Sequence, residues 1–158
     1  MRVTVANPTP VPPSPLVDQS FGLDQLPAFM ASADTIVVSL PLLPEVRGIV
    51  GKDALAAMRP DAVIINVGRG PIIDQTALYS ALKERRIGGA VIDTWYAYPT
   101  DANPRILPAR LPFHELDNIV MMPHMSAWTD GTVRRRQQTM AENIGRLERG
   151  EPLMNVVA

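Results

Sequence analysis

The sequence predicts an α/β fold with a parallel-dominated sheet and helices on both of its faces. The observation that predicts it is one strand–helix–strand unit. The apolar run 62–67 is rich in β-branched residues and too short for most helices, so it is typical of a buried strand. A turn at 68–70 follows, Asp74 opens a helical pattern that Gly88 and Gly89 close, and 89–93 is a second strand. Such a unit joins parallel strands.

Before this unit, the pattern predicts a strand over 2–6 and another over 35–40. The prolines of 8–15 forbid helix and indicate an extended surface loop between them. Short helices are predicted over 23–31 and 53–58, the first on condition that its internal proline, Pro27, falls in the first turn.

After this unit, residues 96–116 are broken by prolines, which predicts a long irregular connection. A last short strand is expected over 119–122 and a long helix over 129–149. Thr129 or Asp130 can cap that helix, and Gly150 suits its end. We find no internal repeat and no linker that would divide the chain.

The bulk composition excludes several classes of function. The chain has 158 residues, 46% of them apolar, which suffices for one domain with a core. A net charge of −1 predicts no nucleic-acid partner, and the lack of a long apolar run predicts no membrane association. There is no cysteine and only two histidines, so we expect no metal site. The absence of a signal peptide predicts a cytoplasmic protein.

Four motifs, in this order, resemble the NAD-binding region of the D-isomer-specific 2-hydroxyacid dehydrogenase family, a superfamily that includes formate dehydrogenases. They are Leu40-Pro41-Leu42 after a strand, Asn66-Val67-Gly68-Arg69-Gly70 with Asp74, Ile92-Asp93-Thr94-Trp95, and Pro123-His124-Met125-Ser126-Ala127-Trp128-Thr129. The resemblance implies a Rossmann-like fold, truncated at its N-terminus, and covers almost the whole chain.

The part of the family pattern that is missing concerns the cofactor phosphates. Family members carry a G-x-G-x-x-G loop that places backbone N–H groups on the pyrophosphate, and this sequence has no such pattern. The resemblance aligns 2–6 with the family's second strand. Residues 1–158 are therefore expected to form a partial dinucleotide-binding domain plus a C-terminal helix, without the substrate domain. NAD binding by the isolated chain is expected to be weak or absent.

The resemblance implies catalytic roles for Arg69 and His124. Arg69 would hold the substrate carboxylate through its planar guanidinium, and His124 would exchange the hydroxyl proton. Taken alone, Arg69 could be a solvated turn residue and His124 a structural histidine; the joint motif favours the catalytic roles. Asp93 would accept from the nicotinamide amide, or merely cap a turn. The cofactor-binding residues implied are Asn7, Leu40, Pro41, Val67, Gly68, Asp93 and Ser126.

One position departs from the family pattern. Most 2-hydroxyacid members pair the histidine with a glutamate before a proline, and here Tyr98 precedes Pro99. A neutral tyrosine cannot stabilise an imidazolium as a carboxylate does. The formate branch has a neutral glutamine there and a serine matching Ser126. Tyr98 therefore favours formate or an atypical carboxylate as the substrate. A simple packing role for Tyr98 is the alternative.

Two functions therefore compete. The chain is part of an NAD(P)-dependent oxidoreductase acting on a small carboxylate substrate and inactive alone, or it is a non-catalytic α/β interaction module derived from one. Asn7 stands where NAD-specific members carry an acid, and no arginine follows to bind a 2′-phosphate, so we favour NAD without excluding NADP. Without the family's first strand, the edge of a neighbouring strand would be exposed, and such an edge pairs readily with another chain. This predicts a homo-oligomer or a missing N-terminal half.

Overall fold

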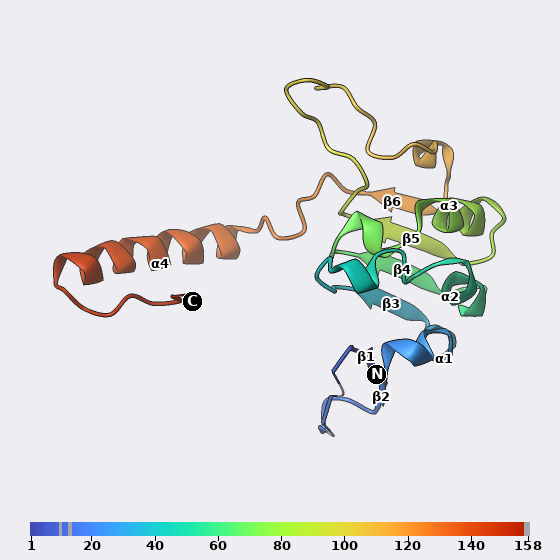
Figure 1. The fold of residues 1–158 in the computed structure, drawn as a ribbon, viewed down its shortest axis with the longest axis horizontal. Helices are drawn as coiled ribbons and strands as arrows, with labels where there is room; N and C mark the ends of the chain where they lie inside the picture. Colours follow the sequence, from blue (N-terminus) through green and yellow to red (C-terminus); the bar gives the residue numbers. More distant parts are fainter. Residues whose placement is uncertain (10, 13, 157–158) are drawn as a thin grey trace. The chain divides into compact units, whose positions relative to one another are not determined.

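Four parallel strands form the main sheet of the computed structural model, which describes residues 1–9, 11–12 and 14–156. The strands are β3 (Thr35–Val38), β4 (Val63–Asn66), β5 (Gly89–Ile92) and β6 (Ile119–Met121), in the order β3-β4-β5-β6 (Figure 1). All three pairings are parallel, as the strand–helix–strand unit predicted. The sheet belongs to the first of two compact units, Met1–His124; the second is Met125–Ala158.

A separate two-stranded sheet precedes it. Strand β1 (Thr4–Ala6) pairs in parallel with β2 (Gln19–Phe21), and neither belongs to the main sheet. The sequence predicted β1 but placed it in one sheet with the others, and it missed β2. The reason is that Gln19-Ser20-Phe21 is short and mostly polar, and its pairing to β1 is a tertiary effect that no local pattern reveals.

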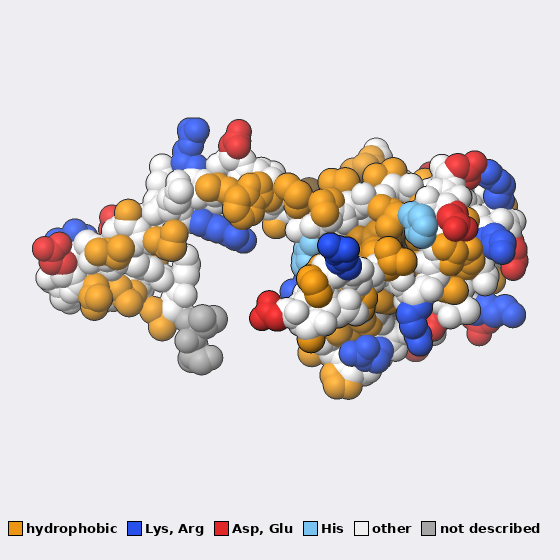
Figure 2. Space-filling model, turned by 90° about the horizontal axis from the view of Figure 1, so that it is seen from above, with side chains coloured by type: hydrophobic (Ala, Val, Ile, Leu, Met, Phe, Trp, Pro, Cys, Tyr) orange, Lys and Arg blue, Asp and Glu red, His pale blue; other side chains and the backbone are white. Residues whose placement is uncertain are grey.

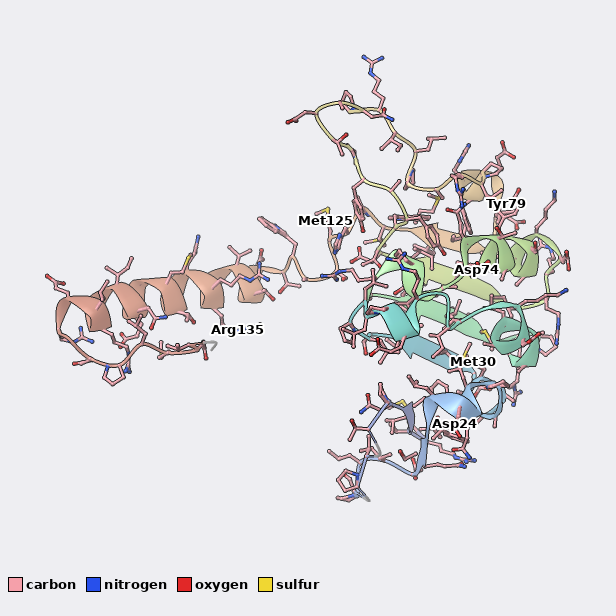
Figure 3. The ribbon with its side chains drawn as sticks, in the orientation of Figure 1. Asp24, Met30, Asp74, Tyr79, Met125 and Arg135 are labelled. Carbon is pink, nitrogen blue, oxygen red and sulfur yellow. The ribbon has the colours of Figure 1, made fainter. Side chains whose placement is uncertain are left out.

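The helices of this unit pack on one face of the main sheet. They are α1 (Leu26–Ala31), α2 (Lys52–Ala57) and α3 (Gln75–Lys83). Their apolar sides share a core with Ile36, Ile64 and Ile92, and Met30 of α1 lies against the sheet (Figure 3). Short 3-10 helices, η1 (Leu23–Gln25), η2 (Pro44–Val46), η3 (Gly70–Ile72) and η4 (Phe113–Glu115), lie in the connections.

The opposite face of the main sheet carries an apolar row. Val37, Ile65, Val91 and Val120 lie side by side on successive strands. Val37 and Val120 are 56% and 54% exposed. The helices α1, α2 and α3 lie on the other face, where they share the core with Ile36, Ile64 and Ile92.

The ends of α3 show what the sequence predicted and what it did not. Asp74 caps its start, because its carboxylate accepts from Ala77 N at 2.8 Å. The helix ends at Lys83 rather than at Gly88 and Gly89. Arg85 takes the left-handed conformation (φ 51°), and Arg85 N and Arg86 N donate back into the last turn. These bonds form a Schellman motif, which normally uses glycine at this position.

The second unit is built on the helix α4 (Asp130–Glu148), close to the predicted 129–149. Thr129 caps it by accepting from Thr132 N, and Gly150 ends it at φ 68°, as predicted. Apolar side chains of α4 are exposed within the unit, among them Met140, Ile144 and Leu147 (Figure 2). In the described part of the chain, no helix combines the length and the apolar character that spanning a membrane requires.

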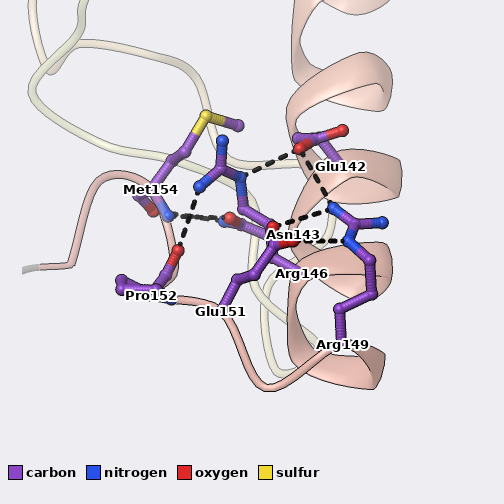
Figure 4. A network of polar contacts seen from close by, with 7 residues as sticks. All are labelled: Glu142, Asn143, Arg146, Arg149, Glu151, Pro152 and Met154. Atoms are coloured by element: carbon purple, nitrogen blue, oxygen red, sulfur yellow. Dashed lines mark hydrogen bonds and ion pairs between the residues drawn. The ribbon is translucent and has the colours of Figure 1, made fainter.

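Residues after α4 fold back onto it. Met154 N donates to Asn143 Oδ1 at 2.8 Å, and Asn143 Nδ2 donates to Met154 O at 3.2 Å. Arg146 donates to Pro152 O and pairs with Glu142 (Figure 4). The tail is therefore held in place by polar contacts with its own helix.

Candidate active site

The predicted site residues of the first unit follow the carboxyl ends of strands, all but Asn7 on the main sheet. Asn7 follows β1, Val67 and Arg69 follow β4, Asp93 follows β5, and His124 lies three residues beyond β6. Backbone bonds continue past the strands. Val67 N and Gly68 N donate to Val38 O, Asp93 N to Asn66 O, and Met122 N to Ile92 O. The segments after β3, β4, β5 and β6 are thus held side by side at one edge.

Asn66 shapes the turn that carries Arg69. It is the last residue of β4 and is 1% exposed. Its Nδ2 donates to Arg69 O at 3.1 Å, and its Oδ1 accepts from Gly68 N at 3.1 Å. The sequence analysis assigned roles to Arg69 and Gly68 but none to Asn66. In the structure, the buried Asn66 side chain holds the backbone of both residues in place.

The Arg69 guanidinium is exposed and lies over its own turn. Its Nη1 donates to Gly68 O at 2.7 Å. Gly68 itself packs closely, because a Cβ there would fall 2.8 Å from Leu40 O. Only glycine allows the β4 turn to approach the β3 turn this closely. Leu40 and Gly68 are therefore in close contact.

The remaining predicted cofactor residues differ in exposure. Val67 is 38% exposed and Pro41 is exposed, while Leu40 is half-buried. Asn7 is half-buried, and its side chain donates to Thr9 O at 2.9 Å. Ser126 belongs to the second unit.

Asp93 is buried, with 2% of its surface exposed, and Thr94 beside it is fully buried. Among the described residues, the Thr94 hydroxyl has no hydrogen-bond partner. Sequence reasoning missed Thr94, because no sequence pattern reports an unsatisfied buried hydroxyl. A polar pair held this deep at the end of a central strand costs stability, which is typical of a functional site.

His124 lies beside Tyr98. Their ring centroids are 5.6 Å apart at an angle of 42°. Tyr98 Oη accepts from Trp95 N at 2.9 Å, and Trp95 Nε1 donates to Met122 O at 2.8 Å. His124 has a φ of 60°, a conformation uncommon outside glycine. Trp95 thus connects the β5 turn to the segment that carries His124. The sequence analysis named Trp95 only as part of a motif.

An apolar cavity of about 610 Å³ adjoins this tyrosine. Its lining includes Trp95, Tyr98, Met121, Met122 and Pro123. Tyr96, on the other side of Trp95, is largely buried. Burial, with a smaller contribution from the nearby Asp74 carboxylate, raises the pKa of the Tyr96 hydroxyl well above its usual range. Tyr96 therefore stays neutral at physiological pH.

Arg69 and His124 share an edge but not a direct contact in the described structure. β5 lies between the strands β4 and β6 that precede them. That both side chains open with Asp93 onto one cleft stays a prediction. In the described ranges, no group of three or more His, Asp or Glu side chains could hold a metal ion.

The apolar residues Val67 and Pro41 are exposed at this edge, whereas Asp93 and Thr94 are buried beneath it. For the pyrophosphate, the sequence contains no glycine-rich loop before a helix.

A parallel sheet with polar side chains at the carboxyl ends of its strands defines the class of dinucleotide-binding α/β domains. Residues 1–126 match the family profile described as the NAD binding domain of D-isomer specific 2-hydroxyacid dehydrogenase. The chain belongs to this family, as the sequence motifs indicated.

Individual relatives support the assignment. D-3-phosphoglycerate dehydrogenase of Methanocaldococcus jannaschii is 35% identical over 144 residues, which cover 89% of this chain and 26% of that protein. D-lactate dehydrogenase of Lactobacillus jensenii, solved with NAD+, has a TM-score of 0.78 at 25% identity and covers 99% of this chain and 48% of that one. An acyclic imino acid reductase in complex with NADPH and D-Arg has a TM-score of 0.78 at 28% identity, covering 100% of this chain and 46% of its own. The chain spans less than half the length of these relatives.

Proposed function

We propose that this chain forms the nicotinamide-side half of an NAD(P)-dependent oxidoreductase site that acts on a small carboxylate substrate. The observation that carries the proposal is the edge itself. Arg69, Asp93 and His124 follow three neighbouring strands whose ends are linked by backbone hydrogen bonds. The names of the relatives favour the same chemistry, since D-lactate and D-3-phosphoglycerate are both carboxylates.

Each side chain has a role that suits its surroundings. When bound, the nicotinamide supplies or accepts the hydride. Arg69 is exposed, so its planar fork is accessible to a substrate carboxylate. His124 would exchange a proton with the substrate hydroxyl. The Asp93 carboxylate would accept from the nicotinamide amide.

Tyr98 determines how this site differs from a typical one. Its ring lies against His124, at the place where most members have a glutamate. A tyrosine ring brings no carboxylate, so it lacks the ionic stabilisation that a glutamate gives to an imidazolium. Proton exchange with a hydroxyl should be slower than in a glutamate-bearing member. Formate oxidation requires no such exchange, so formate belongs on the substrate panel.

The isolated chain is expected to show no useful turnover. The 158 residues contain no glycine-rich phosphate loop, and the substrate domain that the resemblance implies is not expected among them. Positioning of reactants alone can supply roughly 7–11 kcal/mol of the barrier reduction. NAD is preferred to NADP because no arginine follows Asn7 to bind a 2′-phosphate.

A coupled NADH absorbance assay with formate and a panel of D-2-hydroxy acids tests this proposal. We expect rates at background for the isolated chain. Turnover near 1 per second, abolished by Arg69→Ala and retained by Arg85→Ala on a distant exposed turn, would overturn the half-site interpretation.

The second candidate is a non-catalytic interaction module. The apolar row Val37–Ile65–Val91–Val120, exposed at Val37 and Val120, favours it. Cofactor binding distinguishes the two functions. An interaction module would show no saturable binding of NAD+ or nicotinamide mononucleotide, whereas a half-site would bind them at the β4 and β5 turns.

A further inference from the structure

A pocket of about 820 Å³ lies among three connecting segments of the first unit. Its lining residues come from the connection between β3 and α2, from the segment that starts α3, and from the connection that follows β5. The volume is within the range of small-molecule binding sites. Arg69, Asp93 and His124 are not among the lining residues, so the pocket is distinct from the candidate active site.

Backbone hydrogen bonds hold the walls of this pocket together. Gly48 N, in the connection before α2, donates to Pro71 O at 2.8 Å. The connection after β5 folds back on itself, because Tyr96 N and Ala97 N both donate to Pro108 O, at 3.2 and 3.0 Å. Walls that are fixed in this way make a preformed site, which loses less freedom when a ligand binds.

Apolar side chains form much of the lining. Ile73 and Ala109 are buried, whereas Ile106 and Leu107 are 38% and 61% exposed. A hydrocarbon group placed in the pocket would remove the exposed apolar surface from water, which is favourable. The lining therefore suits a ligand with an apolar body.

Two arginines that line the pocket are unpaired in the described part of the chain. Arg47 and Arg110 are both exposed, and within residues 1–9, 11–12 and 14–156 neither guanidinium has an ion pair or a hydrogen bond. Arg59 and Arg85 of the same unit, by contrast, pair with acidic side chains. A free guanidinium presents a planar fork that matches the two oxygens of a carboxylate. The pocket therefore combines apolar surface with two anchors for an anion.

The Asp74 carboxylate determines which anion the pocket favours. Asp74 lines the pocket at the start of α3 (Figure 3) and accepts from Ala77 N at 2.8 Å. Two guanidinium groups and one carboxylate leave a net charge of +1 in the lining, which a monoanion balances. A phosphate dianion exceeds this balance and is repelled more strongly by Asp74. Burial raises the pKa of Tyr96, so its hydroxyl in the lining stays protonated and can donate to a bound carboxylate.

We propose that this pocket binds a small amphiphilic monocarboxylate, a molecule with one carboxylate on a short hydrocarbon chain. The carboxylate would pair with Arg47 and Arg110, and the chain would lie against Ile73, Ile106 and Leu107. The proposal goes beyond the oxidoreductase half-site and does not rest on it, because none of the nicotinamide-side residues takes part.

An NMR titration of the isotopically labelled full chain with hexanoate tests the proposal. Amide shifts are followed at Gly48 and Ala109, which line the pocket from two different segments. Acetate keeps the carboxylate but lacks the chain, and hexan-1-amine keeps the chain but reverses the charge. We expect saturable shifts with hexanoate, an affinity at least about tenfold lower for acetate, and no saturable shift with the amine. Hexyl phosphate should bind more weakly than hexanoate.

Single substitutions locate the anchors. Arg47→Ala and Arg110→Ala should each weaken hexanoate binding about tenfold, as expected for the loss of one charge-assisted hydrogen bond. Arg105→Ala is the matched control, because Arg105 is exposed on the same connection as Arg110 but does not line the pocket. Asp74→Asn keeps an oxygen for Ala77 N and removes the repelling charge, so it should tighten binding about two- to fivefold. If circular dichroism shows that an alanine variant is unfolded, lysine takes the place of alanine, since it keeps the charge but lacks the fork, and binding should still weaken.

Several results would overturn the proposal. They are the absence of saturable shifts at Gly48 and Ala109, a loss for Arg105→Ala as large as that for the lining arginines, and tighter binding of hexyl phosphate than of hexanoate. Shifts confined to Met121 would place the probe in the apolar cavity beside Tyr98 instead. Because these amides and side chains lie outside the candidate active site, failure here would leave the proposed function untouched.

Discussion

The substitution Asn66→Ala tests how the Arg69 turn is built. Asn66 makes two side-chain hydrogen bonds, to Arg69 O and from Gly68 N, each at 3.1 Å. Both backbone groups keep a second partner, because Gly68 N also donates to Val38 O and Ile72 N donates to Arg69 O. The variant therefore leaves no orphaned backbone group. The loss should be that of two ordinary buried bonds, about 2 kcal/mol of unfolding free energy.

Replacement by aspartate should cost more than replacement by alanine. In Asn66→Asp, an oxygen replaces the Nδ2 donor and faces the Arg69 carbonyl oxygen in a site that is 1% exposed. Burial and this repulsion favour the protonated acid, so the folded-state pKa of the new group would be raised. The penalty then grows as pH rises above its unfolded pKa, near 3.9, and is smallest below it.

Urea unfolding followed by Trp95 fluorescence measures these changes. Trp95 is 5% exposed in the first unit, whereas Trp128 is 69% exposed in the second, so the series is made in a Trp128→Phe background. Asn143→Ala is the matched control, since Asn143 also makes two backbone hydrogen bonds, but in the second unit. A loss below about 0.5 kcal/mol for Asn66→Ala, or one no larger than that of the control, would refute this account of the turn.

Three further outcomes follow from single contacts. Gly70→Ala should destabilise the first unit by about 1–3 kcal/mol in the same urea assay, because a Cβ would lie 2.3 Å from Trp95 O; an unchanged midpoint would contradict the close approach. Tyr96→Phe should remove part of the alkaline sensitivity. Burial raises the folded pKa of Tyr96, so its contribution is present below the unfolded value near 10 and is lost as pH rises above it, by at most about 1.4 kcal/mol per pH unit; parallel wild-type and variant curves between pH 9 and 11 would argue against this. Arg85→Gly should raise the thermal midpoint, with a gain of about 0.5–1 kcal/mol, because glycine adopts φ 51° without strain; a lower midpoint would show that the exposed Arg85–Asp117 pair outweighs it.

The sequence predicted the centre of the fold because the local signals there agree. β4, α3 and β5 combine β-branched runs with an Asp74 cap, and their predicted parallel pairing is confirmed. The prediction was wrong where tertiary pairing overrides the local pattern. Strand β2 forms by pairing with β1, and α3 ends at Lys83 because the backbone turns at Arg85 without glycine.

The candidate site divides in a similar way. The motifs placed Arg69, Asp93 and His124 at strand ends, and Tyr98 was expected next to His124, where its ring now lies. The supporting contacts of Asn66, Thr94 and Trp95 could not be predicted, because each depends on burial or on a partner distant in sequence. Trp95 and Met122, for example, are joined by a hydrogen bond across 27 positions. What these residues do chemically stays a prediction from the resemblance.

An NMR titration with nicotinamide mononucleotide tests the central claim most directly, because this ligand needs no pyrophosphate cradle. Amide shifts of the isotopically labelled chain are followed at the β4 turn, at Asp93 and at His124, with adenosine monophosphate as the matched control ligand. The half-site predicts saturable shifts at Val67 and Asp93 with the nicotinamide ligand, reduced by Asp93→Asn. Absence of any shift at this edge up to millimolar ligand, or equal shifts with both ligands, would contradict it.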